Sequence, residues 1–429
     1  MEQIIRVAVI GAGPAGLCAA RNLKSNPIFQ FVVYESQNEI GGTWIFTEEI
    51  GNNKYGQPIQ SSMYRDLRTN LPKEIMGYPD FPFPSAGESF IHHSEVLKYL
   101  RNYAQHHQLS KYIELNSCVK EIKPKKIENK IVWIIKSHHM PSNSIKENIF
   151  DAVMMCNGHY SSPYIPKIIG LDKFNKLVMH NHEYRSKEIF KNLKVVILGA
   201  SQSGCDIAIE IADVAEEVIL SHNQPFIKSP FPTNTVQKPG IDFIENDTVI
   251  FLNSEKYKPD ALLFCTGYDY DFDVLHSSVG LKITEKRIIP LYKHLIHINF
   301  PTLAFIGIIS KILPFPIFHQ QIIFFLKVLD GSIILPSKED MEKDTEKDFE
   351  YRKSLGMPIR HSHLMGSLQW MYDKEISSMG KFSPIKPVVV ELYSYVGKCR
   401  EKNLMTYKND NYFILDGHNF VQKEQNKSF

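Results

Sequence analysis

Short apolar runs recur along the chain, and polar or glycine-rich segments separate them. Apolar runs of strand length without alternation are typical of parallel strands that are buried on both faces. We expect such strands at residues 7–10, 31–34, 150–155, 195–198, 218–220 and 302–307. Helical patterns follow the first and fourth of these runs after a glycine-rich turn, at residues 17–23 and 205–214. The chain therefore predicts an α/β fold that contains two strand–helix–strand units.

Other segments show different patterns. Residues 92–100 open an amphipathic helix, and residues 112–149 alternate short apolar runs with charged turns, which predicts a small β-meander. Residues 300–326 favour a core strand and a packed helix, and residues 339–403 favour helices of mixed charge. The prolines and polar residues of 64–84 indicate a long irregular loop, and loops of this kind are often functional.

Residues 11–16 form the pattern G-x-G-x-x-G between the first strand and the first helix. Gly11 permits a tight turn, Gly13 lets a pyrophosphate approach the backbone, and Gly16 lets the helix pack close to the sheet. The N-terminus of that helix favours an anion. Glu35 ends the next strand, about 20 residues further on, where a carboxylate accepts a hydrogen bond from a ribose. This unit predicts a dinucleotide site with the candidate residues Gly11, Gly13, Pro14, Ala15, Gly16 and Glu35.

The same pattern restarts after residues 195–198, with Ser201 in place of the middle glycine. Ser201 is small enough to permit a fairly close approach. The next strand leads into Ser221 and His222, with no acid at the place that Glu35 has in the first unit. A carboxylate would repel a 2′-phosphate, whereas these side chains can donate to it, so the unit favours NADPH; the alternative for His222 is an ordinary turn residue. The candidate residues here are Gly199, Ser201, Gln202, Ser203, Gly204, Ser221 and His222.

Two dinucleotide units in one chain indicate that one binds a flavin dinucleotide and the other a nicotinamide dinucleotide, with a hydride passing between them. We expect the second unit to be inserted in the first. The predicted FAD-binding domain comprises residues 1–167 and 277–429, and the predicted NADPH-binding domain comprises residues 168–276. The predicted fold class is therefore α/β with two Rossmann-like domains.

Between these features, residues 41–44 place two glycines before Thr43 and Trp44. This pattern predicts a loop that closes over a flat ligand, with Gly42, Thr43 and Trp44 as cofactor-binding candidates. An ordinary glycine turn beside a core tryptophan explains the same residues equally well.

Composition excludes several other classes of protein. The formal net charge of +2 over 429 residues gives no field that attracts nucleic acid. The six scattered cysteines form no C-x-x-C pair, which argues against a disulfide reductase or a zinc knuckle, and we expect no metal site. No apolar stretch reaches the ~18 residues of a membrane span, and the first strand begins too early for a signal peptide. We expect a cytoplasmic or soluble secreted protein without a membrane anchor, and homo-oligomers are an open option.

The sequence resembles the flavin-containing monooxygenases, the class B N- and S-oxygenases, over nearly the whole chain. The segments that carry the likeness are residues 11–16, 41–44, 69–74, 80–84, 199–204 and 265–268. The family motif F-x-G-x-x-x-H-x-x-x-F/Y maps onto Phe174, His180 and Tyr184, with Lys176 in place of its glycine. Baeyer–Villiger relatives end this motif in tryptophan, so Tyr184 disfavours that class.

The resemblance implies a mechanism. NADPH reduces FAD, oxygen adds to the reduced flavin to give a C4a-hydroperoxide, and a soft nucleophile takes the distal oxygen. It also implies that Asn70 is a catalytic residue at the reactive edge of the flavin, a role to set against that of a turn former, and that Thr69, Asn70 and Thr266 contact the cofactors.

The lack of a C-terminal apolar anchor resembles the soluble insect branch, which includes pyrrolizidine-alkaloid (senecionine) N-oxygenases. The sequence thus favours N-oxidation of a tertiary amine, as in alkaloid detoxification, with O2 as co-substrate. The alternatives are an S-oxygenase acting on a thioether, a Baeyer–Villiger monooxygenase, and a flavin-binding scavenger or NADPH-linked sensor without turnover.

Overall fold

A seven-stranded sheet forms the centre of the first half of the molecule. The computed structural model describes residues 4–423. The strand order is β20–β21–β22–β7–β1–β2–β3, with β20 and β21 antiparallel to their neighbours and the others parallel. The strands are β1 (Ile5–Ile10), β2 (Phe29–Tyr34), β3 (Ile113–Glu114), β7 (Ala152–Met155), β20 (Leu291–Tyr292), β21 (Ile296–His297) and β22 (Leu303–Phe305).

The alternation of side chains along β1 divides the core into two layers. Val7 and Val9 face α1 (Pro14–Lys24), α3 (His93–His106) and α5 (Pro314–Leu329), whereas Ala8 and Ile10 face the opposite side. An antiparallel meander covers that side, as predicted, and consists of β4 (Ser117–Ile127), β5 (Lys130–His139) and β6 (Ser144–Phe150). The single strand expected over residues 150–155 is wrong in one respect, because Phe150 ends β6 and β7 begins at Ala152.

The second sheet repeats this plan. Its order is β12–β11–β10–β16–β9, and all neighbours are parallel. Val195 and Ile197 face α4, whereas Val196 faces a three-stranded antiparallel sheet that the sequence analysis did not predict. The elements are β9 (Leu177–His180), β10 (Lys194–Leu198), α4 (Gln202–Ala212), β11 (Glu217–Ser221), β12 (Thr235–Lys238), β13 (Ile241–Glu245), β14 (Thr248–Phe251), β15 (Lys256–Tyr257) and β16 (Ala261–Phe264).

Along the chain, the second sheet lies between β7 and β22 of the first sheet, so one Rossmann-like unit is inserted in the other. The chain crosses between the sheets twice, through β8 (Ser162–Pro163) and β17 (Tyr268–Asp269), which pair with each other in antiparallel fashion. The domain limits at residues 167/168 and 276/277 stay a prediction.

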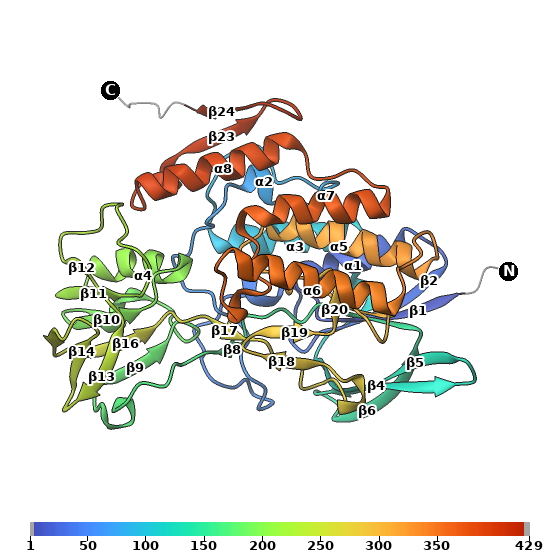
Figure 1. Cartoon of the computed structure of the whole chain (residues 1–429), viewed down its shortest axis with the longest axis horizontal. Helices are drawn as coiled ribbons and strands as arrows, with labels where there is room; N and C mark the ends of the chain where they lie inside the picture. The colour runs from blue at the N-terminus through green and yellow to red at the C-terminus, as the bar shows by residue number, and fades with distance from the viewer. Residues whose placement is uncertain (1–3, 424–429) are drawn as a thin grey trace.

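Residues 339–403 are largely helical, as the charge pattern predicted, and α5 and α7 contribute residues to the core cluster that contains Val7 and Val9 of the first sheet. Figure 1 shows α4 and the second sheet on the left, the meander on the right, and α5 to α8 stacked between and above them. The remaining elements are α2 (Lys73–Met76), β18 (Lys282–Thr284), β19 (Arg287–Ile289), α6 (Lys338–Ser354), α7 (Gln369–Gly380), α8 (Pro387–Lys402), β23 (Asn411–Ile414) and β24 (Phe420–Lys423). Within residues 4–423, every helix is too short or too polar to cross a membrane.

Candidate functional site

The glycine turn after β1 has a geometry that requires glycine at two positions. Gly11 has φ +103°, and a Cβ there would lie 2.6 Å from the carbonyl oxygen of Cys156, at the end of β7. A Cβ on Gly16 would overlap the carbonyl oxygen of Gly11. The first turn of α1 therefore packs directly on the end of the strand, as the sequence predicted, and its N-terminus opens at the carboxyl edge of the sheet. This is the edge at which ligands bind in parallel α/β sheets.

The loop at residues 41–44 closes against this turn. Gly41 N–H donates to the Ala12 carbonyl over 3.0 Å, and a Cβ on Gly13 would lie 3.5 Å from the Cα of Gly42. Gly42, Thr43 and Trp44 form a short 3₁₀ helix, η1 (Gly42–Trp44). The Trp44 indole is half-buried on the core, edge-to-face with Phe315 of α5. The loop thus lies on the glycine turn, and its tryptophan packs on the core.

Glu35 directly follows β2 beside the glycine turn, and it is 4% exposed. Its carboxylate accepts a hydrogen bond from Ala12 N–H over 2.6 Å and from Gln37 N–H over 2.8 Å. Burial raises the pKa of Glu35, and these two hydrogen bonds oppose the rise. In this structure Glu35 fastens the end of β2 to the glycine turn; its hydrogen bond with a ribose stays a prediction.

The turn after β10 has the same geometry as the first. Gly199 has φ +109°, a Cβ there would overlap the carbonyl oxygen of Cys265 at the end of β16, and a Cβ on Gly204 would overlap the carbonyl oxygen of Gly199. Ser201 takes the N-cap position of α4 without a capping hydrogen bond from its side chain. Ser201 and Ser203 are exposed at this end of the helix, where an anion would bind.

The two residues proposed for a 2′-phosphate are largely buried. Ser221 has no exposed surface, and its hydroxyl donates to the carbonyl of Pro239 over 2.8 Å. His222 is 8% exposed, and its ring nitrogens lie 3.1 Å from Gln237 Oε1 and 3.2 Å from the Gln224 carbonyl. The expectation that the Ser221 hydroxyl donates to the phosphate does not fit this geometry, because its single O–H is already used inside the sheet.

Thr69 and Asn70 lie in a segment beside residues 90–92, and the chain bends at Asn70. Thr69 is buried and held from both sides, because its N–H donates to the Ile91 carbonyl over 2.8 Å and its Oγ1 accepts from Ile91 N–H over 3.1 Å. The Asn70 side chain is partly exposed, and its Oδ1 lies 3.5 Å from the hydroxyl of Tyr407. Asn70 does not adopt a left-handed backbone, so a left-handed turn does not explain its presence.

The family motif lies at the crossing between the two sheets. His180 ends β9, donates from Nε2 to the Gly267 carbonyl over 3.0 Å, and accepts from His182 N–H at Nδ1 over 3.1 Å. Burial lowers the pKa of His180 to about 4, so the ring is neutral at pH 7. Thr266 donates to the Tyr164 carbonyl in the same crossing. Lys176 is exposed and has no left-handed backbone, so the missing glycine requires no strain there.

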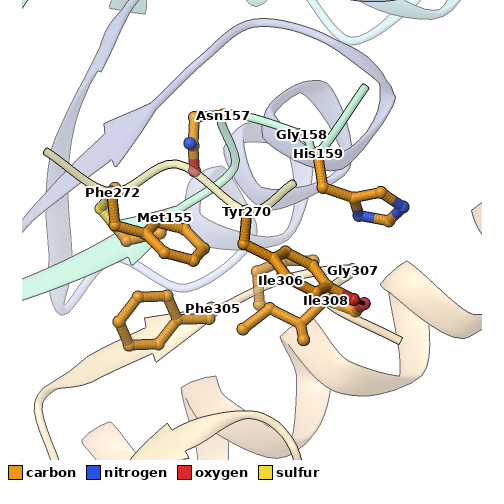
Figure 2. Close-up of a pocket in the computed structure, with 10 residues that line it drawn as sticks. All are labelled: Met155, Asn157, Gly158, His159, Tyr270, Phe272, Phe305, Ile306, Gly307 and Ile308. Carbon is orange, nitrogen blue, oxygen red and sulfur yellow. Dashed lines mark hydrogen bonds between the residues drawn. The ribbon is translucent and has the colours of Figure 1, made fainter. Parts of the chain in front are cut away.

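A small pocket lies between the loops that follow β7 and β22 (Figure 2). Its volume is about 10 Å³, roughly the space of one water molecule. The side chains of Met155, Phe272 and Phe305 gather at one end, and the imidazole of His159 points away from them. Tyr270 donates to the Ile308 carbonyl over 2.7 Å and closes the other end. The pocket is a gap within the sheet edge, too small for a nucleotide.

Each glycine turn has beside it one buried polar atom without a partner among the described residues. Within residues 4–423, the Thr43 hydroxyl beside the first turn and the Gln202 side-chain oxygen beside the second have no hydrogen-bond partner. Buried polar groups are normally paired, so a ligand with donors and acceptors fits both places. The residues present therefore fit one dinucleotide at each turn.

Comparison with known proteins gives the family. The chain matches the flavin-binding monooxygenase-like family over residues 4–227 and 233–395. It is 35% identical to the flavin-containing monooxygenase FMO GS-OX-like 4 of Arabidopsis thaliana, over 97% of this chain and 95% of that protein. The structure of S-allyl-L-cysteine S-oxygenase from Allium sativum has a TM-score of 0.88 and 32% identity, covering 95% of this chain and 96% of that one.

A second solved structure, Tmm from a Pelagibacter strain, has a TM-score of 0.84 and 26% identity, covering 95% and 93% of the two chains. Cyclohexanone monooxygenase, at 13% identity, a TM-score of 0.64 and coverage of 88% and 98%, shares the fold.

None of the relatives named here is an insect enzyme, so they support the family and not the insect N-oxygenase branch. Sequence reasoning also missed the C-terminal residues around Tyr407, because nothing in their local pattern marks them as neighbours of Asn70. The family match, the relatives and the two glycine turns agree: the chain belongs to the flavin-binding monooxygenase family and is an oxidoreductase that uses FAD and NADPH.

Proposed function

We propose that this protein transfers one oxygen atom from O2 to a soft nucleophile, with a thioether sulfur as the first candidate. The observation that carries the proposal is the repeated glycine turn. One such turn follows a strand of each large sheet, and its geometry fits a dinucleotide in both places. The reaction balances as substrate, O2, NADPH and a proton giving oxygenated substrate, NADP⁺ and water. The bound flavin, once reduced, supplies the activation of O2.

The residues of the chain bind and orient the two dinucleotides. The N-termini of α1 and α4 would bind the pyrophosphates of FAD and NADPH through free backbone N–H groups. Gly42, Thr43 and Trp44 would lie along the first dinucleotide, and Gln202 along the second. The amide of Asn70 would stabilise the reacting oxygen, because it offers a donor and an acceptor without carrying a charge that titrates.

The relative from Allium sativum is an S-allyl-L-cysteine S-oxygenase, which supports a thioether for this chain. The second candidate is the nitrogen of a tertiary amine, such as a pyrrolizidine alkaloid. Both nucleophiles bring their own lone pair and need no base from the protein. A ketone is disfavoured because Tyr184 stands where Baeyer–Villiger relatives have tryptophan.

The test is NADPH oxidation by the holoenzyme in the presence of S-allyl-L-cysteine, a tertiary amine or cyclohexanone, with product masses measured. We expect the thioether to accelerate NADPH oxidation and to gain one oxygen atom. Faster turnover and oxygen gain with the amine alone would select the N-oxygenase. Lactone formation would select the Baeyer–Villiger class, and oxidation that no nucleophile accelerates would overturn oxygen transfer.

A further inference from the structure

The segment after α8 contacts both halves of the molecule. We call residues 404–409 the strap; it ends in η8 (Tyr407–Asn409). Leu404 N–H donates to the Ser229 hydroxyl over 2.7 Å, and the Leu404 side chain packs in the core of the second sheet. Tyr407 is 2% exposed and packs edge-to-face on Phe90, in a core cluster of the first half. Only two residues, Met405 and Thr406, thus separate the anchor on one half from the anchor on the other.

Lys408 joins helix α4 to the segment that precedes Asn70. Its ammonium lies 2.7 Å from the Asp206 carboxylate in α4 and donates to the Arg68 carbonyl over 3.3 Å. Arg68 returns a hydrogen bond to the Lys408 carbonyl over 2.7 Å. The Lys408 and Asp206 side chains are only 16% and 10% exposed, so water screens this ion pair much less than a surface pair.

The contacts form a continuous path from the second glycine turn to Asn70. Asp206 lies in the second turn of α4, whose N-terminus faces the proposed NADPH pyrophosphate. Lys408 connects Asp206 to Arg68, two residues before Asn70, and the adjacent Tyr407 hydroxyl lies 3.5 Å from the Asn70 side-chain oxygen. A nucleotide that restricts the motion of α4 would therefore also restrict the motion of residues 68–70.

We propose that the strap couples nucleotide binding at α4 to the position of the Asn70 amide, with Lys408 as a positioning residue. The proposal rests on the proposed function, in which Asn70 contacts the reacting oxygen. NADP⁺ that stays bound at α4 keeps Asp206 in place, Asp206 holds Lys408, and Lys408 with Tyr407 holds residues 68–70. Coupling of this kind is reciprocal, so order in residues 68–70 also favours nucleotide binding.

The test is amide hydrogen exchange of the FAD-loaded protein, followed in the peptide over residues 65–72 with and without saturating NADP⁺. We expect NADP⁺ to slow exchange in the wild type by about fivefold or more. Lys408→Met should lose that effect, and Lys408→Arg should restore it, because a guanidinium can also pair with Asp206. Lys408→Met should also send a larger share of NADPH oxidation to hydrogen peroxide.

Lys187→Met is the matched control. Lys187 pairs with Asp213 over 2.6 Å at the other end of α4, and neither residue of that pair bonds to residues 68–70. The control should retain the NADP⁺ effect. Asp206→Asn provides a second way to break the pair if Lys408→Met does not fold.

Equal NADP⁺ protection in the wild type and in the variant with a broken pair would overturn the proposal. So would the absence of protection in the wild type, or its loss in Lys187→Met as well. Exchange needs no substrate. If NADP⁺ protects residues 65–72 through Lys408 but no nucleophile is oxygenated, the coupling stands and the proposed function fails.

Discussion

The absence of a side chain at Gly16 and Gly204 decides how closely each nucleotide helix approaches its strand. At both positions a Cβ would overlap a backbone carbonyl oxygen, that of Gly11 or of Gly199. Backbone atoms at the end of a buried strand cannot move aside as a flexible side chain can, so even one methyl group is costly here.

We therefore expect Gly16→Ala to destabilise the protein by about 3 kcal/mol or more, and to yield protein with little bound FAD. Gly397→Ala is the matched control, because Gly397 lies in α8 with open space around the added methyl group. Alanine there should stabilise the helix by about 0.5–1 kcal/mol. The flavin-to-protein absorbance ratio and the unfolding midpoint measure both variants, and normal flavin content in Gly16→Ala would contradict the argument.

Asn70 carries the second prediction at this scale. Asn70→Ala should retain FAD and NADPH oxidation, because Thr69 and not Asn70 fastens the segment to residues 90–92. Product yield should fall by about tenfold or more as a stabilising amide contact is lost, with hydrogen peroxide formed instead. Peroxide and oxygenated product are quantified per NADPH oxidised. If the variant still forms one oxygenated product per NADPH oxidised, Asn70 has no catalytic role. Loss of FAD would show that its role is structural.

At the scale of elements, the carboxyl end of β11 is the place where the sequence distinguishes NADPH from NADH. The acid that follows β2 has no counterpart there, and Ser221 and His222 take the corresponding place. The hydroxyl of Ser221 donates to the Pro239 carbonyl, so we expect the preference to come from His222 and from the missing carboxylate.

We predict that the wild type prefers NADPH and that His222→Asp reduces this preference roughly fivefold, as expected for about 1 kcal/mol of charge repulsion near water. His222→Asn removes the imidazole without adding a charge and separates the two effects. The ratio of kcat/KM for NADPH to that for NADH is the measurement. An unchanged ratio in His222→Asp would mean that the 2′-phosphate does not lie near this strand end.

At the scale of the whole molecule, a buried pair of histidines joins the C-terminal helices to the first half. His363 Nε2 accepts from Ile288 N–H over 2.9 Å, so its proton is on Nδ1, which faces His294 Nδ1 at 2.9 Å. His294 in turn donates from Nε2 to Asp348 over 3.2 Å, and Arg352 donates to the same carboxylate over 2.7 Å. Burial lowers the pKa of both histidines, that of His363 well below its usual value.

The lowered pKa of His363 determines how the stability of the folded protein changes with pH. The unfolded chain takes up a proton on His363 near pH 6.5, whereas the folded protein keeps the ring neutral to lower pH. The stability that depends on this ring is therefore complete above about pH 6.5 and is lost as the pH falls. For one such ring, the loss between pH 7 and pH 5 is about 2 kcal/mol.

We expect His363→Gln to remove that part of the pH dependence, since a glutamine oxygen can still accept from Ile288 N–H but does not titrate. Urea unfolding at pH 7 and pH 5 gives the two free energies. The change between them should be smaller than in the wild type by about 2 kcal/mol. His418→Gln changes an exposed histidine in the β23–β24 turn and should behave as the wild type. If the free energy of unfolding changes equally between pH 7 and pH 5 in all three proteins, His363 is not the source of the pH dependence.

The sequence by itself determined the two strand–glycine–helix units, their order in the chain and the meander, because these depend on local apolar periodicity and on turns that only glycine can make. It also indicated two different nucleotides, from Glu35 at the end of one strand and its absence from the other. The short strands and the three-stranded sheet of residues 241–257 escaped it, since their few residues carry no distinct period.

Only the tertiary structure decided which side chains are free and which are already paired. Ser221 carries a hydroxyl that could bind a phosphate, yet in the folded protein this hydroxyl is buried and donates to the Pro239 carbonyl, directly after β12. Asn70 and Tyr407, or Asp206 and Lys408, lie hundreds of residues apart and meet because the strap after the last helix contacts both halves. Local pattern carries no information on such contacts, because they depend on how complete elements pack.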